Sequence, residues 1–187
     1  ISLEQNTKKK EAIEKRNKKF SNLEVVDNLN DINEKFDYIT LIGLEKSNLE
    51  LHELLDKLKE YLKTHGKILL ATNNKLSIDN MSKLNSQNET IEDIAKKQYS
   101  LSELEKQIKQ AGFENKKVYY PLTDYKLPNA IFTSEEQIRE NLTNRNIIYN
   151  DKETVKLYEQ NNLYRELLKE DIKYLEMFIN SFFIEIF

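Results

Sequence analysis

The chain has 187 residues, of which 39% are hydrophobic and 33% are charged, so it has the composition of a globular protein. Its 29 basic and 32 acidic residues give a net charge of -3, and this balance gives no broad positive field for nucleic acid or an anionic membrane. The absence of cysteine excludes disulfides and thiolate chemistry, and two isolated histidines argue against a histidine-built metal site. No apolar run approaches the about 20 residues that span a bilayer, and the amino end is not a signal peptide, so we expect a cytoplasmic protein.

The first part of the chain predicts strands and a helix in alternation. Residues 1–4 have the pattern of a strand end, which suggests a chain that is N-terminally incomplete. The charged segment 6–19, which lacks Gly and Pro, predicts an exposed helix capped by its first residue. A short strand is expected over 23–26. The aromatic and β-branched run 36–42, closed by Gly43, predicts a strand buried on both faces.

The middle of the chain continues this alternation. Leucines at 51, 54, 55, 58 and 62 recur at helical spacing and predict a helix over 48–63. Gly66 then stands where a left-handed C-terminal cap is expected, and 67–72 predicts a second buried strand. The segment 73–99 lacks periodicity, and we expect a long loop that overhangs the carboxyl edge of the sheet.

The last part of the chain predicts one further helix and strand pair and then a terminal strand. Ser100 with Glu103 forms a capping-box pattern for a helix that ends before Gly112. A strand over 117–121 follows. A helical stretch over 158–178 precedes the apolar segment 180–187, which we expect to pair antiparallel with its neighbour.

Strands that alternate with amphipathic helices predict parallel pairing, because each crossover helix must cover a face of the sheet. We therefore predict a single domain over 1–187 of the α/β class, with a doubly wound, mostly parallel sheet and a terminal antiparallel strand.

Five segments in this order resemble a known family. They are FDYITLIG (36–43), KLKEYLKTHGKILLATNNK (57–75), YSLSELEKQIKQAGF (99–113), YYPLTDYKLPNAIFT (119–133) and NSFFIEI (180–186). Together they look like the class I S-adenosylmethionine (SAM) methyltransferases found in bacterial surface-polysaccharide gene sets, sometimes beside or fused to glycosyltransferases. The resemblance implies a Rossmann-like fold and SAM as the cofactor.

The resemblance also implies positions for the cofactor. An acidic residue at the end of the family's second strand accepts hydrogen bonds from the ribose hydroxyls, and Glu4 stands at that position. Asn28 with Leu29, or Asp27 in place of Asn28, matches the position that meets the adenine edge. Gly43 ends the strand nearest the sulfonium and permits close backbone approach. On sequence grounds alone, Glu4 is equally consistent with a solvated carboxylate.

The acceptor side of the site is less well defined. Asn73 and Asn74 end a predicted strand where a substrate would enter, although Asn is also a common turn residue. Tyr120, Asp124 and Tyr125 place aromatic and acidic groups near Pro121, and these are weak candidates because strand aromatics are usually core residues. The resemblance implies a small or sugar-type acceptor, and the residues identify no catalytic base.

One part of the family pattern is absent from this chain. The three glycines stand apart from one another, so the glycine-rich loop that holds the methionine part of SAM, and the first strand before it, are not here. We expect the chain alone to be inactive, unless a partner chain or a homodimer completes it. A non-catalytic module that docks on a glycosyltransferase is therefore the alternative. A glycosyltransferase domain itself would need an Asp-x-Asp metal pair, which the sequence lacks.

Overall fold

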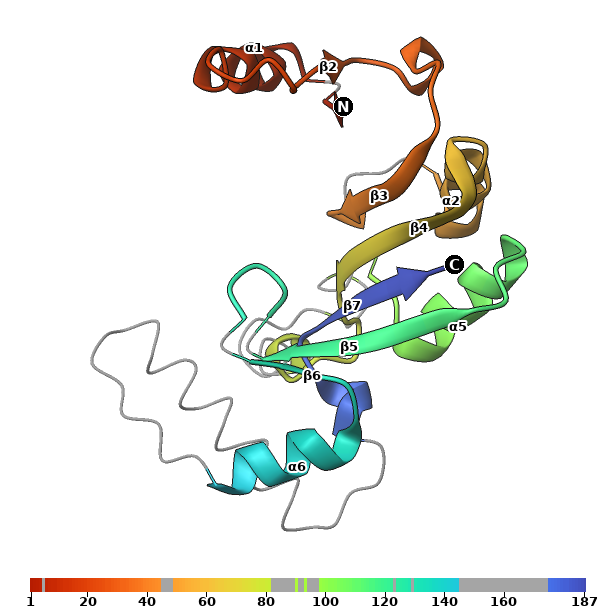
Figure 1. Ribbon diagram of the computed structural model, residues 1–187. Coiled ribbons are helices and arrows are strands. Elements are labelled where there is room, and N and C mark those ends of the chain that lie inside the picture. Colours follow the sequence, from red (N-terminus) through yellow and green to blue (C-terminus); the bar gives the residue numbers. More distant parts are fainter. Residues whose placement is uncertain are drawn as a thin grey trace. The chain divides into compact units, whose positions relative to one another are not determined.

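The computed structural model describes residues 1–4, 6–44, 49–81, 90, 93, 98–122, 124–128, 130–144 and 175–187. The chain divides into two compact units, Ile1–Lys35 and Phe36–Phe187, which are described separately below (Figure 1). The single domain over 1–187 therefore stays a prediction.

The first unit contains β1 (Ser2–Leu3), α1 (Thr7–Arg16), β2 (Val25–Val26) and the 3-10 turn η1 (Leu29–Asp31). β1 and β2 pair in parallel, with Ser2 opposite Val25 and Leu3 opposite Val26. The predicted helix cap is confirmed, because the side chain of Asn6 accepts a hydrogen bond from the Lys9 backbone N–H at 3.1 Å.

The second unit is built on a five-stranded sheet of order β3-β4-β7-β5-β6. β3 and β4 pair in parallel, whereas β7 lies antiparallel between β4 and β5. Because β4 and β5 are both antiparallel to β7, β3, β4 and β5 run in the same direction. The predicted α/β class and terminal antiparallel strand are thus confirmed. The elements are β3 (Phe36–Ile42), α2 (Leu51–Lys59), β4 (Leu62–Asn73), α5 (Leu101–Gln110), β5 (Lys116–Leu122), β6 (Ala130–Phe132), α6 (Glu135–Asn144), η3 (Leu175–Phe178) and β7 (Ser181–Ile186).

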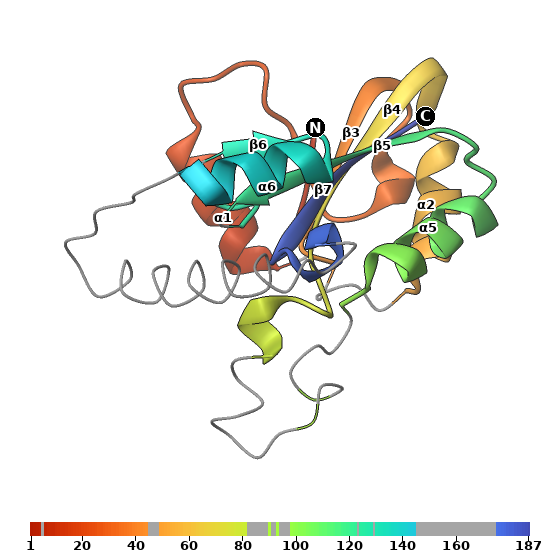
Figure 2. The ribbon, with the colours of Figure 1, turned by 90° about the horizontal axis from the view of Figure 1, so that it is seen from below.

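The central strands and two helices supply the apolar core of this unit. Phe182 and Ile184 of β7 and Ile68 and Leu70 of β4 are completely buried. Helices α2 and α5 lie together on one side of the sheet (Figures 1 and 2). Each helix buries one apolar stripe, as its sequence spacing predicts. The buried residues of the two stripes are Leu51, Leu55, Leu58, Leu104 and Ile108.

Strand β3 is an edge strand of the described sheet, since it pairs only with β4. Every side chain of β3 is either partly buried or exposed, and those of Tyr38 and Ile42 are 62% and 64% exposed. The prediction of a strand buried on both faces is therefore wrong for the described part of the chain. An apolar strand pattern indicates a buried position only when a neighbouring layer covers both of its faces.

The helix end and the glycine cap before β4 were also predicted wrongly. The helix ends at Lys59, β4 begins at Leu62, and Gly66 lies within that strand without a left-handed conformation. The β3–β4 register shifts between Phe36 and Tyr38, so β4 carries extra residues at this point. A Cβ atom on Gly66 would stand 2.8 Å from the carbonyl oxygen of Phe36, so glycine permits a close backbone approach here.

Two elements near the carboxyl end were not predicted from the sequence. These are the short strand β6, antiparallel to β5, and the helix α6 after it. Of the helix expected over 158–178, the last four residues form η3, and the rest lies outside the described residues. By contrast, the Ser100 capping box and the left-handed Gly112 are confirmed.

Candidate functional site

In the first unit, Glu4 and Asp27 leave adjacent strands at the same edge. Leu3 lies opposite Val26 in the parallel ladder, and the backbone N–H of Glu4 donates to the carbonyl oxygen of Val26 at 3.0 Å. Asn28 follows Asp27 directly and caps η1. The structure therefore brings together the ribose and adenine candidates of this unit, at the carboxyl ends of two parallel strands, where open α/β sheets bind their ligands.

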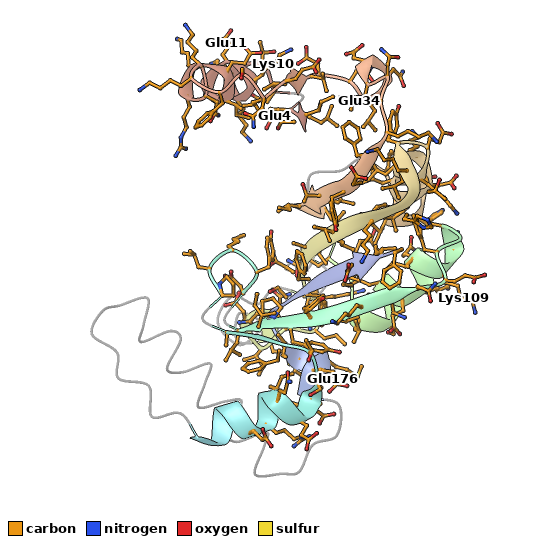
Figure 3. The ribbon with its side chains drawn as sticks, viewed as in Figure 1. Glu4, Lys10, Glu11, Glu34, Lys109 and Glu176 are labelled. Carbon is orange, nitrogen blue, oxygen red and sulfur yellow. The ribbon has the colours of Figure 1, made fainter. Side chains whose placement is uncertain are left out.

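Each of these side chains has a local partner. One carboxylate oxygen of Glu4 accepts from the backbone N–H of Asn6 at 2.9 Å, and the side-chain oxygen of Asn28 accepts from the N–H of Asn30 at 3.1 Å. Asp27 forms an ion pair with Lys10 at 2.9 Å, and this hydrogen bond raises the pKa of the lysine. Figure 3 labels Glu4 and Lys10 in this unit. A carboxylate has about four acceptor sites, so the one bond to Asn6 leaves Glu4 able to accept further hydrogen bonds.

In the second unit, the carboxyl ends of β3, β4 and β5 share one edge of the sheet. Gly43 follows β3 with a φ of 80°, the left-handed conformation that favours glycine. Asn73 ends β4 and lies opposite Ser181, the first residue of β7. This edge of the sheet therefore carries Gly43 and Asn73, two of the residues that the sequence suggested for the site.

Asn74 is completely buried, and its side chain binds the backbone around it. Its amide nitrogen donates to the carbonyl oxygens of Met177 at 2.6 Å and Ile179 at 2.7 Å, and its oxygen accepts from the N–H of Leu76 at 3.0 Å. Asn80, also buried, donates to the carbonyl oxygen of Asn74 at 3.0 Å. Asn74 therefore connects the end of β4 to η3 and the start of β7.

The other acceptor-side candidates follow β5. Tyr120 is half-buried, and its ring meets that of Phe182 edge-on at 6.3 Å between centroids. Burial, and then the negative charges of Glu176 and other carboxylates, raise the pKa of Tyr120 to about 12, so its hydroxyl stays neutral at physiological pH. Asp124 accepts from the N–H groups of Lys126 and Leu127 at 2.6 and 3.2 Å, and Tyr125 lies beside Lys126.

Sequence reasoning did not single out Glu176. This residue lies in η3 beside α6, and Figure 3 labels it there. One of its carboxyl oxygens is buried and has no hydrogen-bond donor among the described residues. Glu135 and Arg139 of α6 lie next to it. No sequence signal could have found this group, because its partners belong to an element that the sequence pattern did not predict.

A cavity of about 500 Å³ lies elsewhere, between α2 and the end of α5. His52, Asp56 and Gln110 line it, and none of the predicted site residues does. Within the described ranges, no three metal-binding side chains gather at one point, and every helix is too short or too polar to cross a bilayer.

Comparison with solved structures identifies the fold. A SAM-dependent methyltransferase from Thermotoga maritima, described as a possible histamine N-methyltransferase, superimposes with a TM-score of 0.60 at 15% identity. The match covers 100% of this chain and 72% of that one. A SAM-dependent methyltransferase from Archaeoglobus fulgidus gives a TM-score of 0.55 at 16% identity, and the match covers 98% of this chain and 73% of that one.

The chain has the fold of a SAM-dependent methyltransferase. No protein-family model matches the sequence, and no curated protein does. In a methyltransferase fold, the carboxyl edges that carry Glu4, Asp27 and Asn28 in one unit, and Gly43 and Asn73 in the other, are the edges at which a ligand is expected.

Proposed function

We propose that this chain is part of a SAM-dependent methyltransferase that acts on a small or sugar-type acceptor. The observation that carries the proposal is the position of Glu4. Glu4 follows β1 at its carboxyl end, and its backbone N–H bonds to Val26 of the parallel strand β2, which Asp27 and Asn28 follow directly. A carboxylate at such a strand end suits the two hydroxyls of a ribose, because it offers two acceptor oxygens.

The residues present fit the nucleoside end of SAM. Glu4 retains acceptor capacity for the ribose, and the turn at Asn28 and Leu29 presents polar groups to an adenine edge. Gly43 offers backbone without a side chain at the end of β3. No glycine-rich loop for the methionine part occurs among the three separate glycines of this chain, so the fit extends to the nucleoside only.

The cofactor would supply a methyl group on a positively charged sulfur. Direct transfer of such a group depends mainly on alignment and on the exclusion of water, so a protein base is not required. In this chain, Glu4 and Asn28 would orient the nucleoside, and Asn74 would hold the end of β4 in place beside the acceptor. Asn73, Tyr120, Asp124 and Tyr125 are the proposed acceptor-side residues.

Two considerations support the acceptor class. The Thermotoga maritima structure is described as a possible histamine N-methyltransferase, and histamine is a small molecule. The sequence resembles methyltransferases of surface-polysaccharide gene sets, which favours a sugar or sugar-nucleotide hydroxyl. The same resemblance supports association with a glycosyltransferase.

Substitution of Glu4 tests the proposal directly. We expect Glu4→Gln to weaken binding of S-adenosylhomocysteine at least tenfold, because a hydrogen bond to a charged acceptor contributes about 1.5–3 kcal/mol. The measurement is isothermal titration of the purified chain and, where the gene encodes residues before Ile1, of the extended chain.

Glu11→Gln is the matched control, since Glu11 is an exposed glutamate on α1 and the change in charge is the same (Figure 3). The control variant should bind as the parent chain does. Equal binding by the Glu4 and Glu11 variants would remove Glu4 from the ribose site. Absence of binding by both the short and the extended chain would contradict the methyltransferase proposal.

The second candidate is a non-catalytic module that keeps the methyltransferase fold and contacts a partner. Strand β3 favours it, because among the described residues one edge of this strand is unpaired, its Tyr38 and Ile42 are more than 60% exposed, and unpaired strand edges readily take up another strand. The partner would be a glycosyltransferase or a second copy of the chain. Failure of both chains to bind S-adenosylhomocysteine would favour this candidate.

A further inference from the structure

One face of α1 carries basic side chains around the small Ala12. At about 3.6 residues per turn, these side chains lie within about 120° around the helix axis and span about 12 Å along it. We call this set the basic face, and its members are Lys8, Lys9, Lys15 and Arg16. All four are exposed, and none forms an ion pair with another described residue.

The opposite side of α1 packs against its own unit. Lys10, Ile13 and Asn17 recur at helical spacing, and these three are the half-buried residues of the helix and its C-terminal cap. Lys10 forms the ion pair with Asp27, which follows β2. The basic face is therefore directed away from β2. Figure 3 labels Lys10 and Glu11 of α1, which both lie outside the basic face.

The lysines at the start of α1 oppose the stability of the helix. The N-terminal end of a helix has a partial positive charge, so acidic side chains stabilise its first turn and basic ones destabilise it. The first turn of α1 has no acidic residue. Lys10 has Asp27 as its partner, whereas Lys8 and Lys9 have no ion-pair partner in the described part of the chain. An anion outside the chain would compensate their charge.

An exposed aromatic residue follows the basic face in the chain. Phe20 comes directly after Lys18 and Lys19 and is 61% exposed. A basic cluster with a neighbouring exposed ring suits an anionic bilayer, where lysines meet the lipid phosphates and the ring enters the boundary of the acyl chains. The basic face itself has no Asn, Gln or aromatic side chain, so it lacks most of the groups that read nucleic-acid bases or stack on them.

We propose that the basic face of α1 is an electrostatic docking surface for a membrane that contains anionic phospholipids, with Phe20 entering the headgroup region. The net charge of -3 does not prevent this, because exposed charges more than about 8 Å away are largely screened at physiological ionic strength. Locally, α1 has five basic and two acidic side chains. The surface lies within the first unit, and docking does not depend on methyl transfer.

Co-sedimentation of the whole chain with lipid vesicles tests this docking. The probes are vesicles of phosphatidylcholine alone and vesicles of equal parts phosphatidylcholine and phosphatidylglycerol. At about 0.1 M salt, we expect the chain to bind the anionic vesicles at least about tenfold more strongly than the neutral ones. This preference should disappear at about 1 M salt, where the screening length falls to about 3 Å.

A variant without the basic face should lose most of this binding. Because each lysine or arginine near an anionic surface contributes about fivefold, replacing all four residues with Gln should weaken binding to the anionic vesicles at least tenfold. Four exposed lysines elsewhere provide the matched control, since their replacement with Gln changes the net charge equally. This control variant should bind within about threefold of the parent chain. Its substitutions are Lys35→Gln, Lys57→Gln, Lys106→Gln and Lys109→Gln.

Equal binding by the two variants would overturn the proposal, and so would equal binding of the parent chain to both kinds of vesicle. A chain that binds a short single-stranded RNA but not the vesicles would also overturn it. If circular dichroism shows that the fourfold basic-face variant does not fold, the double variant Lys8→Gln and Lys9→Gln decides the question, since removal of these lysines relieves the helix end. The double variant should bind the anionic vesicles at least about fivefold more weakly, and unchanged binding would overturn the proposal.

Discussion

At the scale of single residues, Glu4 and Asn74 follow strand ends in the sequence but serve different purposes in the structure. Asn74 is completely buried, and both ends of its amide bind backbone groups. Glu4 is half-buried, and its carboxylate has one local donor, the N–H of Asn6. Burial with saturated hydrogen bonds indicates a structural residue, whereas a strand-end carboxylate with spare acceptor capacity can receive a ligand.

Substitution of Asn74 should therefore reduce stability before it affects binding. We expect Asn74→Ala to lower the free energy of unfolding by about 3 kcal/mol, because it leaves the buried carbonyl groups of Met177 and Ile179 without their donor. Urea unfolding, followed by circular dichroism, measures this loss.

Asn115→Ala is a suitable control for Asn74→Ala. Asn115 is exposed, and its backbone groups, which the substitution keeps, pair with Phe187. The free energy of unfolding of the Asn115→Ala variant should differ from that of the parent chain by less than about 0.5 kcal/mol. A loss below about 1 kcal/mol in Asn74→Ala would mean that water replaces the amide, and the structural assignment of Asn74 would fail.

At the scale of elements, local sequence signals predicted beginnings of helices well and the start of β4 poorly. The Asn6 and Ser100 caps depend on hydrogen bonds over three residues, so their sequence patterns are sufficient. Gly66 follows a predicted helix, as a C-terminal cap does, but it lies inside β4 because the chain pairs with β3 from Leu62 onward. A close contact with Phe36 across the sheet cannot be read from residues next to Gly66.

The position of Gly66 predicts a cost for any side chain. We expect Gly66→Ala to reduce the free energy of unfolding by about 2 kcal/mol, because the new Cβ would stand 2.8 Å from the backbone oxygen of Phe36 and 3.1 Å from the nitrogen of Lys63. Thermal or urea unfolding of the variant checks this value.

Thr64→Ala provides the comparison, since Thr64 is an exposed residue of the same strand. Thr64→Ala should lower the free energy of unfolding by less than about 1 kcal/mol, which is the range that strand propensities span. If Gly66→Ala were as stable as the parent chain, the backbone of β4 would be able to move away from β3 at this point.

At the scale of the whole molecule, the two compact units differ in how much they bury. Among the described residues of Ile1–Lys35, Val26 alone is a buried hydrophobic residue, at 7% exposure. In Phe36–Phe187, complete burial extends over strands β4 and β7 and several helices. Chains below about 40 residues rarely bury enough apolar surface to be stable alone.

Native-state hydrogen exchange should therefore separate the two units. We expect the amides of Ser2 and Glu4, which donate to the carbonyl oxygens of Glu24 and Val26, to exchange at least about 100-fold faster than those of β7, after correction for intrinsic rates. The amides of α5 should exchange at rates similar to those of β7. Equal protection in both units would mean that the chain unfolds as one cooperative body, in agreement with the single domain predicted from the sequence.

The sequence by itself determined the alternation of strands and helices, the α/β class, the caps at Asn6 and Ser100 and the strand ends at which candidate residues stand. These features depend on periodicity and on contacts within a few residues, so the order of side chains is enough to specify them. Only the tertiary structure decided that β7 lies between β4 and β5, that β3 is an edge strand of the described sheet, and that α6 packs against η3. Each of these depends on which distant segments share a layer, and local spacing does not encode that choice.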